Sequence, residues 1–360
     1  MAHLFEPLKL RDVTLANRIG IPPMCQYSAH DGMAADWHFI HYGSRAVGGA
    51  GLMILEATAV MPEGRISPGD LGLWNDAQIE PLAHIARFAH EQGCAAAVQL
   101  AHAGRKASIG LGWEPQSSLG AQAGGWQTVA PSAISFGDGY ATPQALDDAG
   151  IRAIVAAFAA ATCRARAAGF PAIEIHAAHG YLLHQFLSPL SNRRTDAWGG
   201  SFENRSRLAR EVVAAARAEW PQHLPLLVRL SATDWVEGGW NVEETVELCR
   251  IFKGLGVDLV DVSSAGLLPT ARIPAGPGFQ TEFAERVRHE AGIPTAAVGL
   301  ITSPQQADHI IRSGQADMVL LGREMLRNPY WPLAAAQALG QTTAWPRQYL
   351  RAGPAGVAAR

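Results

Sequence analysis

The sequence predicts a single (β/α)8 barrel over residues 1–360, and three observations lead to this fold class. Short apolar runs alternate with amphipathic stretches roughly eight times along the chain, which implies a parallel sheet with right-handed crossovers. Most of the runs are continuously apolar, as in parallel strands buried on both faces. Eight units favour a closed barrel over an open, doubly wound sheet, so functional side chains are expected on the loops that follow the strands.

The elements can be placed in chain order. We expect the eight strands at Arg18–Pro22, Leu52–Ala57, Ala95–Leu100, Ala172–His176, Leu224–Leu230, Leu259–Val262, Thr295–Val298 and Met318–Leu321. Amphipathic helices are expected over 151–165, 203–220 and 242–255. The first is the clearest, because apolar residues recur at helical spacing after Asp147, a candidate N-cap.

Composition excludes several function classes. The chain is 48% hydrophobic and 17% charged with a net charge of −3, so no strong field favours nucleic acid or an anionic membrane. Its N-terminal segment lacks the apolar core of a signal peptide, and no run of 18 apolar residues is present. We therefore expect a cytoplasmic protein. Without a CxxC pair, an iron–sulfur cluster or structural zinc is not expected from the scattered cysteines Cys25, Cys94, Cys163 and Cys249.

Two segments exceed the needs of a barrel, which takes about 250 residues. Residues 104–143 are rich in Gly, Ser and Pro and indicate a long excursion after the third strand. Residues 329–360 form a tail rich in Pro and Ala that carries Trp331, Trp345 and Tyr349. Neither segment has the character of an independent domain.

Polar residues gather where the expected strands end. They are Cys25 and Tyr27 after the first strand, Gln99 in the third, His176, His179 and Tyr181 after the fourth, Arg229 in the fifth, Gly299 after the seventh, and Gly322 and Arg323 after the eighth. Glycines after strands seven and eight are typical of the phosphate site of such barrels. Because no paired carboxylates, G-x-S-x-G or G-x-G-x-x-G motif accompanies this set, we expect a bound cofactor to carry the chemistry.

A metal site is the alternative for His176 and His179. Metal-dependent barrel hydrolases usually have His-x-His after the first strand and a carboxylate after the eighth. This chain has Cys25-Gln26 and Gly322-Arg323 at those places, so no metal is expected.

At these residues the chain resembles the old yellow enzyme family, and more closely its thermophilic-like branch with the xenobiotic reductases. The resemblance runs nearly end to end, and Cys25 marks the branch. It is carried by PPMCQYSA at 22–29, DWH at 36–38, EATAV at 56–60, QLAHAGRKAS at 99–108, HAAHGYLLHQFLSP at 176–189 and NRRTDAWGGSFENR at 192–205.

The resemblance implies noncovalently bound FMN at the barrel mouth, with NADPH or NADH as reductant. Gln99 and Arg229 would bond the pyrimidine edge of the flavin, where a fixed positive charge stabilises the anionic reduced ring. A buried structural ion pair is the alternative for Arg229. Cys25 would tune the flavin potential. The remaining contacts would be Pro23, Met24 and Ala57 along the ring and Gly299, Gly322 and Arg323 at the phosphate.

The implied reaction is reduction of activated C=C bonds in α,β-unsaturated carbonyl or nitro compounds. His176 and His179 would donate hydrogen bonds to the acceptor oxygen, hydride would pass from flavin N5 to the β-carbon, and Tyr181 would protonate the α-carbon. Tyr27 would shape the substrate pocket. Two alternatives remain open: another flavin reaction on the same barrel, such as substrate dehydrogenation or amine oxidation, and a flavin-binding module without turnover.

The resemblance also implies a homodimer or a dimer-based oligomer. In that branch an arginine or tryptophan of the tail reaches into the partner's pocket, which makes Arg351 the candidate here. The alternative is that the tail packs only on its own barrel. Arg105 and Lys106 are expected to be solvated, without a role in the site.

Overall fold

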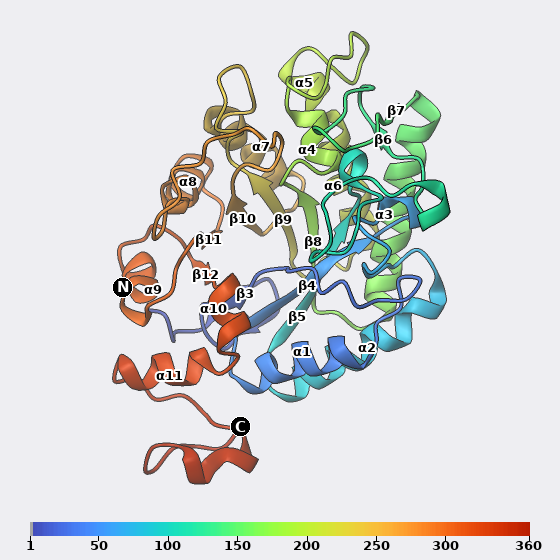
Figure 1. Cartoon of the computed structure of the whole chain (residues 1–360). Helices are drawn as coiled ribbons and strands as arrows, with labels where there is room; N and C mark the ends of the chain where they lie inside the picture. Colours follow the sequence, from blue (N-terminus) through green and yellow to red (C-terminus); the bar gives the residue numbers. More distant parts are fainter. Residues whose placement is uncertain (1–2) are drawn as a thin grey trace.

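The computed structural model describes residues 3–360, and its centre is a closed barrel of eight parallel strands (Figure 1). Each strand overlaps one of the apolar runs named above, so the predicted fold class is confirmed. The last strand pairs with the first and closes the barrel. In order around the barrel the strands are β3 (Ile19–Ile21), β4 (Leu52–Ala59), β5 (Ala95–Ala101), β8 (Ala172–Ala177), β9 (Leu226–Ser231), β10 (Leu259–Ser263), β11 (Thr295–Val298) and β12 (Met318–Leu320).

Helices surround the barrel and cover the outer faces of its strands (Figure 1). Asp147 caps α3 as predicted, because its side chain accepts the Gly150 N–H at 2.8 Å. The helix predicted over 203–220 is interrupted at Ser206, whose hydroxyl donates to the Glu203 carbonyl. The helices are α1 (Asp36–Val47), α2 (Ile79–Glu91), α3 (Asp148–Ala167), α4 (Leu182–Leu187), α5 (Phe202–Arg205), α6 (Arg207–Glu219), α7 (Val242–Gly254), α8 (Thr281–Arg286), α9 (Pro304–Arg312), α10 (Gly322–Arg327) and α11 (Trp331–Ala338).

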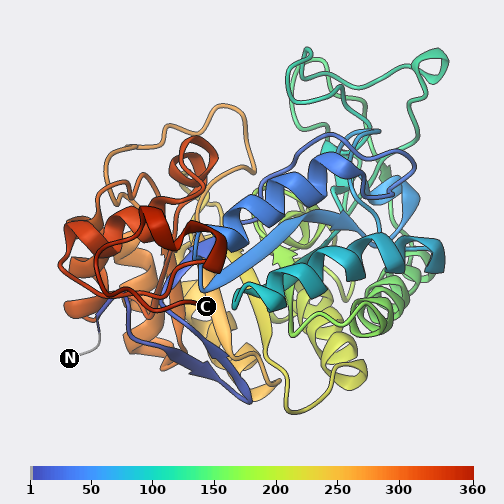
Figure 2. The same ribbon diagram turned by 90° about the horizontal axis from the view of Figure 1, so that it is seen from below.

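The amino-terminal end of the barrel is filled with apolar side chains. A hairpin of β1 (Leu8–Leu10) and β2 (Val13–Leu15), which the sequence analysis did not foresee, places Leu10 and Leu15 in this cluster (dark blue in Figure 2). The hairpin therefore closes this end and leaves the opposite end for the site. The barrel members of the cluster are Leu52, Ile54, Ala97, Ala172, Leu227, Leu259, Ala296, Met318 and Leu320.

The segment between β5 and α3 leaves the barrel and projects beyond it (Figure 2). It contains the short 3-10 turns η3 (Gly104–Lys106) and η4 (Ala121–Ala123), and the small parallel pair β6 (Val129–Ala130) and β7 (Gln144–Ala145). Most of its order comes from hydrogen bonds within loops, as expected for a stretch rich in Gly and Pro.

The C-terminal tail follows α11 and includes the 3-10 turn η6 (Arg347–Ala352). Its end is held on the barrel by Arg360, whose guanidinium donates to the carbonyls of Ala46 and Val47 at the end of α1 and of Gln92 after α2. Among residues 3–360 no helix is both long enough and apolar enough to cross a membrane.

Candidate active site

Four polar side chains lie at one level inside the barrel, immediately above its apolar end. Gln99, Glu174, Arg229 and Asp261 each lie two residues beyond a member of the apolar cluster, and side chains two apart on a strand share a face. The Gln99 amide donates to Glu174 Oε1 at 2.9 Å, and Arg229 Nε lies 2.9 Å from Asp261 Oδ2. We call these four residues the polar layer.

The polar layer holds two carboxyl groups and one cation, all buried. Burial raises the pKa of Glu174 well above its usual range and that of Asp261 to about 6, with Arg229 opposing both shifts. Burial therefore favours the neutral form of Glu174. Within residues 3–360 no acceptor binds the terminal nitrogens of Arg229, so they remain available to a ligand. The buried ion pair that was the alternative for Arg229 is therefore present, and the same side chain also has terminal N–H groups without an acceptor.

Three aromatic rings meet above the polar layer, where β8 ends. The ring centroid of His176 lies 5.3 Å from that of His179 and 5.0 Å from that of Tyr181. Burial, followed by the charge of Arg229, lowers the pKa of both histidines well below the usual value. Both are neutral near pH 7. His176 Nδ1 accepts the Ala178 N–H at 3.3 Å, which leaves its proton on Nε2.

The turn that carries these rings has an unfavourable backbone. His179 has φ 58° and Gly180 has φ 71°, a left-handed pair that a histidine rarely adopts. A side chain at Gly180 would lie 2.1 Å from the carbonyl oxygen of Gly266, so only glycine fits there. The His179 N–H donates to Ser231 Oγ at 2.9 Å, and His179 Nε2 lies 2.7 Å from Ser263 Oγ.

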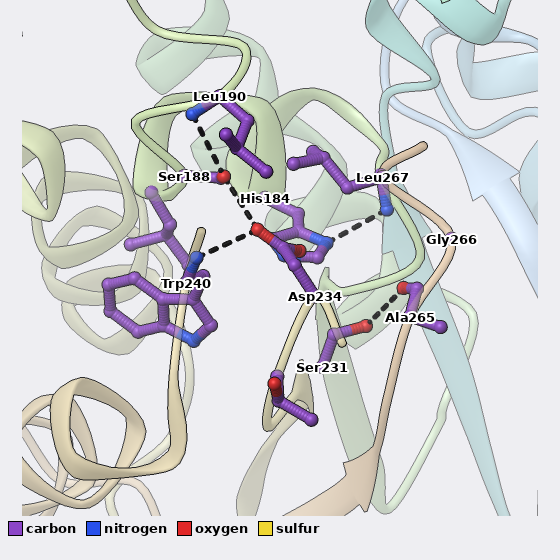
Figure 3. Close-up of polar contacts among 12 residues, drawn as sticks. His184, Ser188, Leu190, Ser231, Asp234, Trp240, Ala265, Gly266 and Leu267 are labelled. Carbon is purple, nitrogen blue, oxygen red and sulfur yellow. Dashed lines mark hydrogen bonds and ion pairs between the residues drawn. The ribbon is translucent and has the colours of Figure 1, made fainter. Parts of the chain in front are cut away.

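A buried His–Asp pair supports the same turn (Figure 3). His184 Nδ1 accepts the Gly180 N–H at 2.9 Å, and its Nε2 lies 3.0 Å from Asp234 Oδ1. The other carboxylate oxygen accepts the Ser188 hydroxyl at 2.6 Å and the Trp240 N–H at 2.8 Å. Because the Asp234 carboxylate lies beside His184 Nε2, the ring proton lies on Nε2, and Nδ1 is left to accept the Gly180 N–H. His184 and Ser188 lie in the HAAHGYLLHQFLSP motif without a predicted role, and Asp234 and Trp240 lie in none of the motifs.

Lys106 and Arg105 are not solvated, and that expectation is wrong. Lys106 Nζ donates to the carbonyls of His179 at 2.9 Å and Gly266 at 3.0 Å, and lies 4.9 Å from the Tyr181 ring centroid. Arg105 is buried and donates to the Leu267 carbonyl at 2.8 Å. The loops after β8 and β10 offer carbonyl groups to Lys106, and the loops after β5 and β10 offer carbonyl groups to Arg105. Burial and the neighbouring Arg105 lower the pKa of Lys106 to about 7.

The loop after β3 brings Cys25 to the other side of the rings. Cys25 and Tyr181 both pack on an apolar cluster that contains Ala57. A bulge in β4 leaves Glu56 out of register, so Ala57 pairs with Gln99 while the Glu56 carboxylate accepts the Gln26 N–H and lies 2.9 Å from the His38 ring. Burial raises the pKa of the Cys25 thiol, which is therefore protonated rather than a reactive thiolate.

A cavity of about 260 Å³ lies at the ends of β11 and β12. It is lined by Gly299, Gly322 and Arg323, the three residues predicted to hold a phosphate. The first N–H groups of α10 have no acceptor within the helix. Gly322 adjoins Met24, whose sulfur would lie 3.5 Å from a Cβ added at the glycine. This cavity and the 22–27 loop are therefore neighbours, as a single cofactor bound to both would require.

Arg351 does not join these residues. It is exposed in η6, and its side chain has no hydrogen bond or ion pair with any of residues 3–360. Figure 1 shows the tail beyond α11, far from α4 and the end of β8. Within the same described residues no three His, Cys, Asp or Glu side chains are placed to hold a metal ion.

Comparison with known proteins assigns the family. Residues 3–341 match the profile of the NADH:flavin oxidoreductase / NADH oxidase family. The chain belongs to this family. It is 48% identical over 354 residues to the NADPH dehydrogenase of Listeria welshimeri, covering 98% of this chain and 99% of that one. The NADPH dehydrogenase of Geobacillus thermodenitrificans is 49% identical over 350 residues, covering 97% and 98%.

Two solved structures are similar to this chain along nearly its whole length. Morphinone reductase in complex with tetrahydroNAD superposes with a TM-score of 0.77 at 30% identity, covering 96% of this chain and 93% of that one. The old yellow enzyme homologue of Zymomonas mobilis gives 0.79 at 25% identity, covering 98% and 99%.

The predicted family, enzyme class and cofactors are thereby confirmed: this is an FMN-dependent NADPH oxidoreductase of the old yellow enzyme family. Its residues fit the cofactor. The unliganded donors of Arg229 lie inside the barrel mouth, and the cradle of Gly299, Gly322 and Arg323 lies at its rim.

Proposed function

We propose that this protein reduces activated C=C bonds of α,β-unsaturated carbonyl and nitro compounds with electrons from NADPH. The observation that carries the proposal is the cluster of His176, His179 and Tyr181 above the polar layer, two neutral imidazoles beside a phenol. Bound FMN supplies the hydride. The side chains bind and polarise the acceptor and deliver the proton.

The histidines act as hydrogen-bond donors. His176 carries its proton on Nε2, and Ser263 beside His179 Nε2 orients the second ring. Donors aimed at an acceptor oxygen withdraw electron density and make the β-carbon electrophilic, without reorganisation during the reaction. Arg229 contributes by keeping both imidazoles neutral, because its charge disfavours their protonation.

Tyr181 is the proposed proton donor to the α-carbon. Burial raises the pKa of its phenol well above the usual value, so the proton is present throughout the neutral range. The backbone of the turn holds the ring, and Lys106 lies over one face. Tyr27, half-buried in the loop after β3, is proposed to bound the substrate pocket.

The geometry of the barrel mouth supports the following proposed cofactor contacts. We assign the pyrimidine edge of the flavin to Gln99 and Arg229 of the polar layer. Cys25, as a neutral thiol, would tune the flavin potential through local polarity. The remaining assignments are Pro23, Met24 and Ala57 along the ring, and Gly299, Gly322 and Arg323 at the phosphate.

The experiment measures the two half-reactions separately by stopped-flow absorbance. NADPH should bleach the flavin, and cyclohexenone should restore its colour. His176→Ala and His179→Ala should each slow recolouring by about 10²–10³, the typical cost of one lost oxyanion donor. His90→Ala, an exposed change on α2, is the matched control.

Three results would contradict the proposal in different ways. Unchanged recolouring in both histidine variants would refute their role. Bleaching by NADPH without recolouring by any enone would favour another flavin reaction. A flavin that NADPH does not bleach would favour a binding module without turnover.

We also propose that the protein is cytoplasmic and forms a homodimer in which Arg351 enters the partner's pocket. The support is that Arg351 is exposed and that its side chain has no hydrogen bond or ion pair with residues 3–360. Beside it on the surface are the large side chains of Tyr330, Tyr349 and Leu350, each at least 36% exposed.

A further inference from the structure

A second cavity, which we call the outer chamber, opens beside the proposed active site. Its volume is about 680 Å³, within the range of small-molecule sites. Three loops enclose it: Tyr27–Asp31 after β3, Arg65–Gly69 after β4, and the excursion, which contributes Trp113 and Trp126. Tyr27 lines the outer chamber and is also proposed to bound the reaction pocket, so we expect a long molecule in the reaction pocket to extend into the outer chamber.

Arg65 provides an unpaired cation at the chamber. Its guanidinium carbon lies 5.3 Å from the Trp74 ring and 5.0 Å from the Trp126 ring, so the planar group is held between two indoles. Its Nε donates to the Pro62 carbonyl at 2.9 Å. Among residues 3–360 no carboxylate pairs with Arg65, and the hydrogen bond from Nε to Pro62 leaves its terminal nitrogens without an acceptor. A fixed guanidinium with free donors is the geometry that binds phosphate bidentately.

Trp113 provides a stacking surface. Its side chain is 70% exposed and meets the Tyr27 ring edge-on, with centroids 5.9 Å apart. The neighbouring Gly112 lies against Tyr27 so closely that a Cβ there would be 2.3 Å from the ring. The loop is therefore held in place while one indole remains uncovered. An exposed indole on a fixed loop can stack with a purine base.

The chemistry of the reductant matches these two features. To reduce a flavin, NADPH must place its nicotinamide in the reaction pocket, so its adenine and 2′-phosphate lie outside. We propose that the outer chamber binds the adenosine 2′-phosphate end of NADPH, with Trp113 stacked on the adenine and Arg65 bound to the phosphate. The proposal rests on the proposed function in placing the reaction pocket beside Tyr27.

Replacement of Asp31 should change phosphate binding in the opposite direction from replacement of Arg65. Asp31 lines the chamber, and its negative charge there would repel a phosphate. Its backbone has φ 49°, a conformation that asparagine tolerates, and its carbonyl accepts the Gln78 amide at 3.1 Å. Asp31→Asn therefore removes the charge while keeping the fold of the loop.

The first test is calorimetric titration of the oxidised, FMN-loaded protein with adenosine 2′,5′-bisphosphate, and with 5′-AMP as the probe lacking the 2′-phosphate. Arg65→Gln should weaken the bisphosphate by on the order of tenfold or more and affect 5′-AMP much less, as for a lost charge-assisted contact. Trp113→Ala should weaken both probes by about fivefold or more. Asp31→Asn should strengthen the bisphosphate. Arg250→Gln, an exposed change on α7, is the charge control.

The second test measures KM for NADPH and NADH with cyclohexenone as acceptor. Arg65→Gln should raise KM for NADPH much more than for NADH. The proposal is overturned if the bisphosphate does not bind the wild-type protein, if Arg65→Gln weakens both nucleotides equally, or if Asp31→Asn weakens the bisphosphate. Cyclohexenone reduction with NADH reports on the proposed function separately, so a failure there is distinguishable from a failure at the outer chamber.

Discussion

Burial determines the protonation state of the side chains at the barrel mouth. The charged form of any group is disfavoured away from water, so burial lowers the pKa of His176 and His179 and raises that of Tyr181 and Cys25. The same physical effect, with opposite signs for bases and acids, yields four neutral groups. The permanent charge of Arg229 adds to this effect at the two histidines.

Replacement of Tyr181, the proposed proton donor, should affect acceptors that are protonated on carbon more than acceptors that are protonated on oxygen. Tyr181→Phe should slow enone reduction by about 10²–10⁴, the usual contribution of a positioned general acid. Quinones receive their protons on oxygen and should be affected little. Stopped-flow rates with cyclohexenone and a benzoquinone measure both, and an equal fall for the two acceptors would show that Tyr181 is not the donor.

Asp70 should make stability depend on pH. Its carboxylate accepts the Ile66 N–H and the Ser67 hydroxyl, each at 2.7 Å, yet burial raises its pKa from 3.8 to about 7. The folded state therefore binds more protons than the unfolded state between these values, and stability from this group falls as pH rises through that window.

The matched variant is Asp70→Asn, which cannot titrate. Its melting temperature should lie furthest below that of the wild type near pH 5, and the gap should narrow toward pH 8. Between pH 5 and pH 8 the free energy of unfolding of the wild type, relative to that of Asp70→Asn, should fall by on the order of a few kcal/mol. Thermal melts in a pH series measure the gap, and a gap independent of pH would contradict the assignment.

At the scale of elements, the turn between β8 and α4 is held from three sides. Ser231 on β9 binds the His179 N–H, Lys106 after β5 binds the His179 carbonyl, and His184 on α4 binds the Gly180 N–H. The left-handed backbone costs free energy that these contacts offset. Three neighbouring elements thus position the rings of one turn.

His184→Ala removes one of these contacts and should loosen the turn without touching the reaction pocket. An unsatisfied buried N–H costs about 1–3 kcal/mol, so we expect weaker binding of phenol and roughly tenfold slower enone reduction. Asp234→Asn, which can still accept from His184 Nε2, should have a smaller effect. Titration with phenol, followed in the flavin absorption, measures positioning. Unchanged phenol binding in a yellow, folded His184→Ala protein would refute the role.

At the scale of the whole molecule, the tail is anchored at one point and exposed at another. Arg360 ties its end to α1 and the end of α2, whereas Arg351 has no partner among residues 3–360. Tyr330 and Tyr349 meet on the same surface, with ring centroids 6.0 Å apart. This combination, aromatic and arginine side chains near each other, is typical of interface anchors.

Subunit mixing tests whether Arg351 acts on its own chain or on a partner. Arg351→Ala should weaken enone binding, while Arg347→Ala in the same turn is the control. Mixed dimers of Arg351→Ala with a full-length His176→Ala/Tyr181→Phe chain should regain activity, because the intact Arg351 of the inactive chain enters the partner's intact pocket. Absence of recovery in proven mixed dimers would show that the tail acts within its own chain.

The sequence by itself determined the eight strands, the fold class and the family. Parallel strands buried on both faces require continuous apolar runs, which are visible without coordinates. Motifs such as HAAHGY placed His176, His179 and Tyr181 on one turn, and in the structure the His176 ring centroid lies 5.3 Å from that of His179 and 5.0 Å from that of Tyr181. The motif was sufficient to predict this cluster because its three residues lie close together in the chain.

Only the tertiary structure decided which distant residues share an environment. Glu174 and Asp261 appeared to be parts of ordinary strands, and closure of the barrel at one register brings them into one layer with Arg229. Lys106 appeared to be a solvated cation until the loops after β8 and β10 provided its carbonyl partners. Contacts between residues far apart in the chain depend on how strands align and loops close, and no local pattern encodes that geometry.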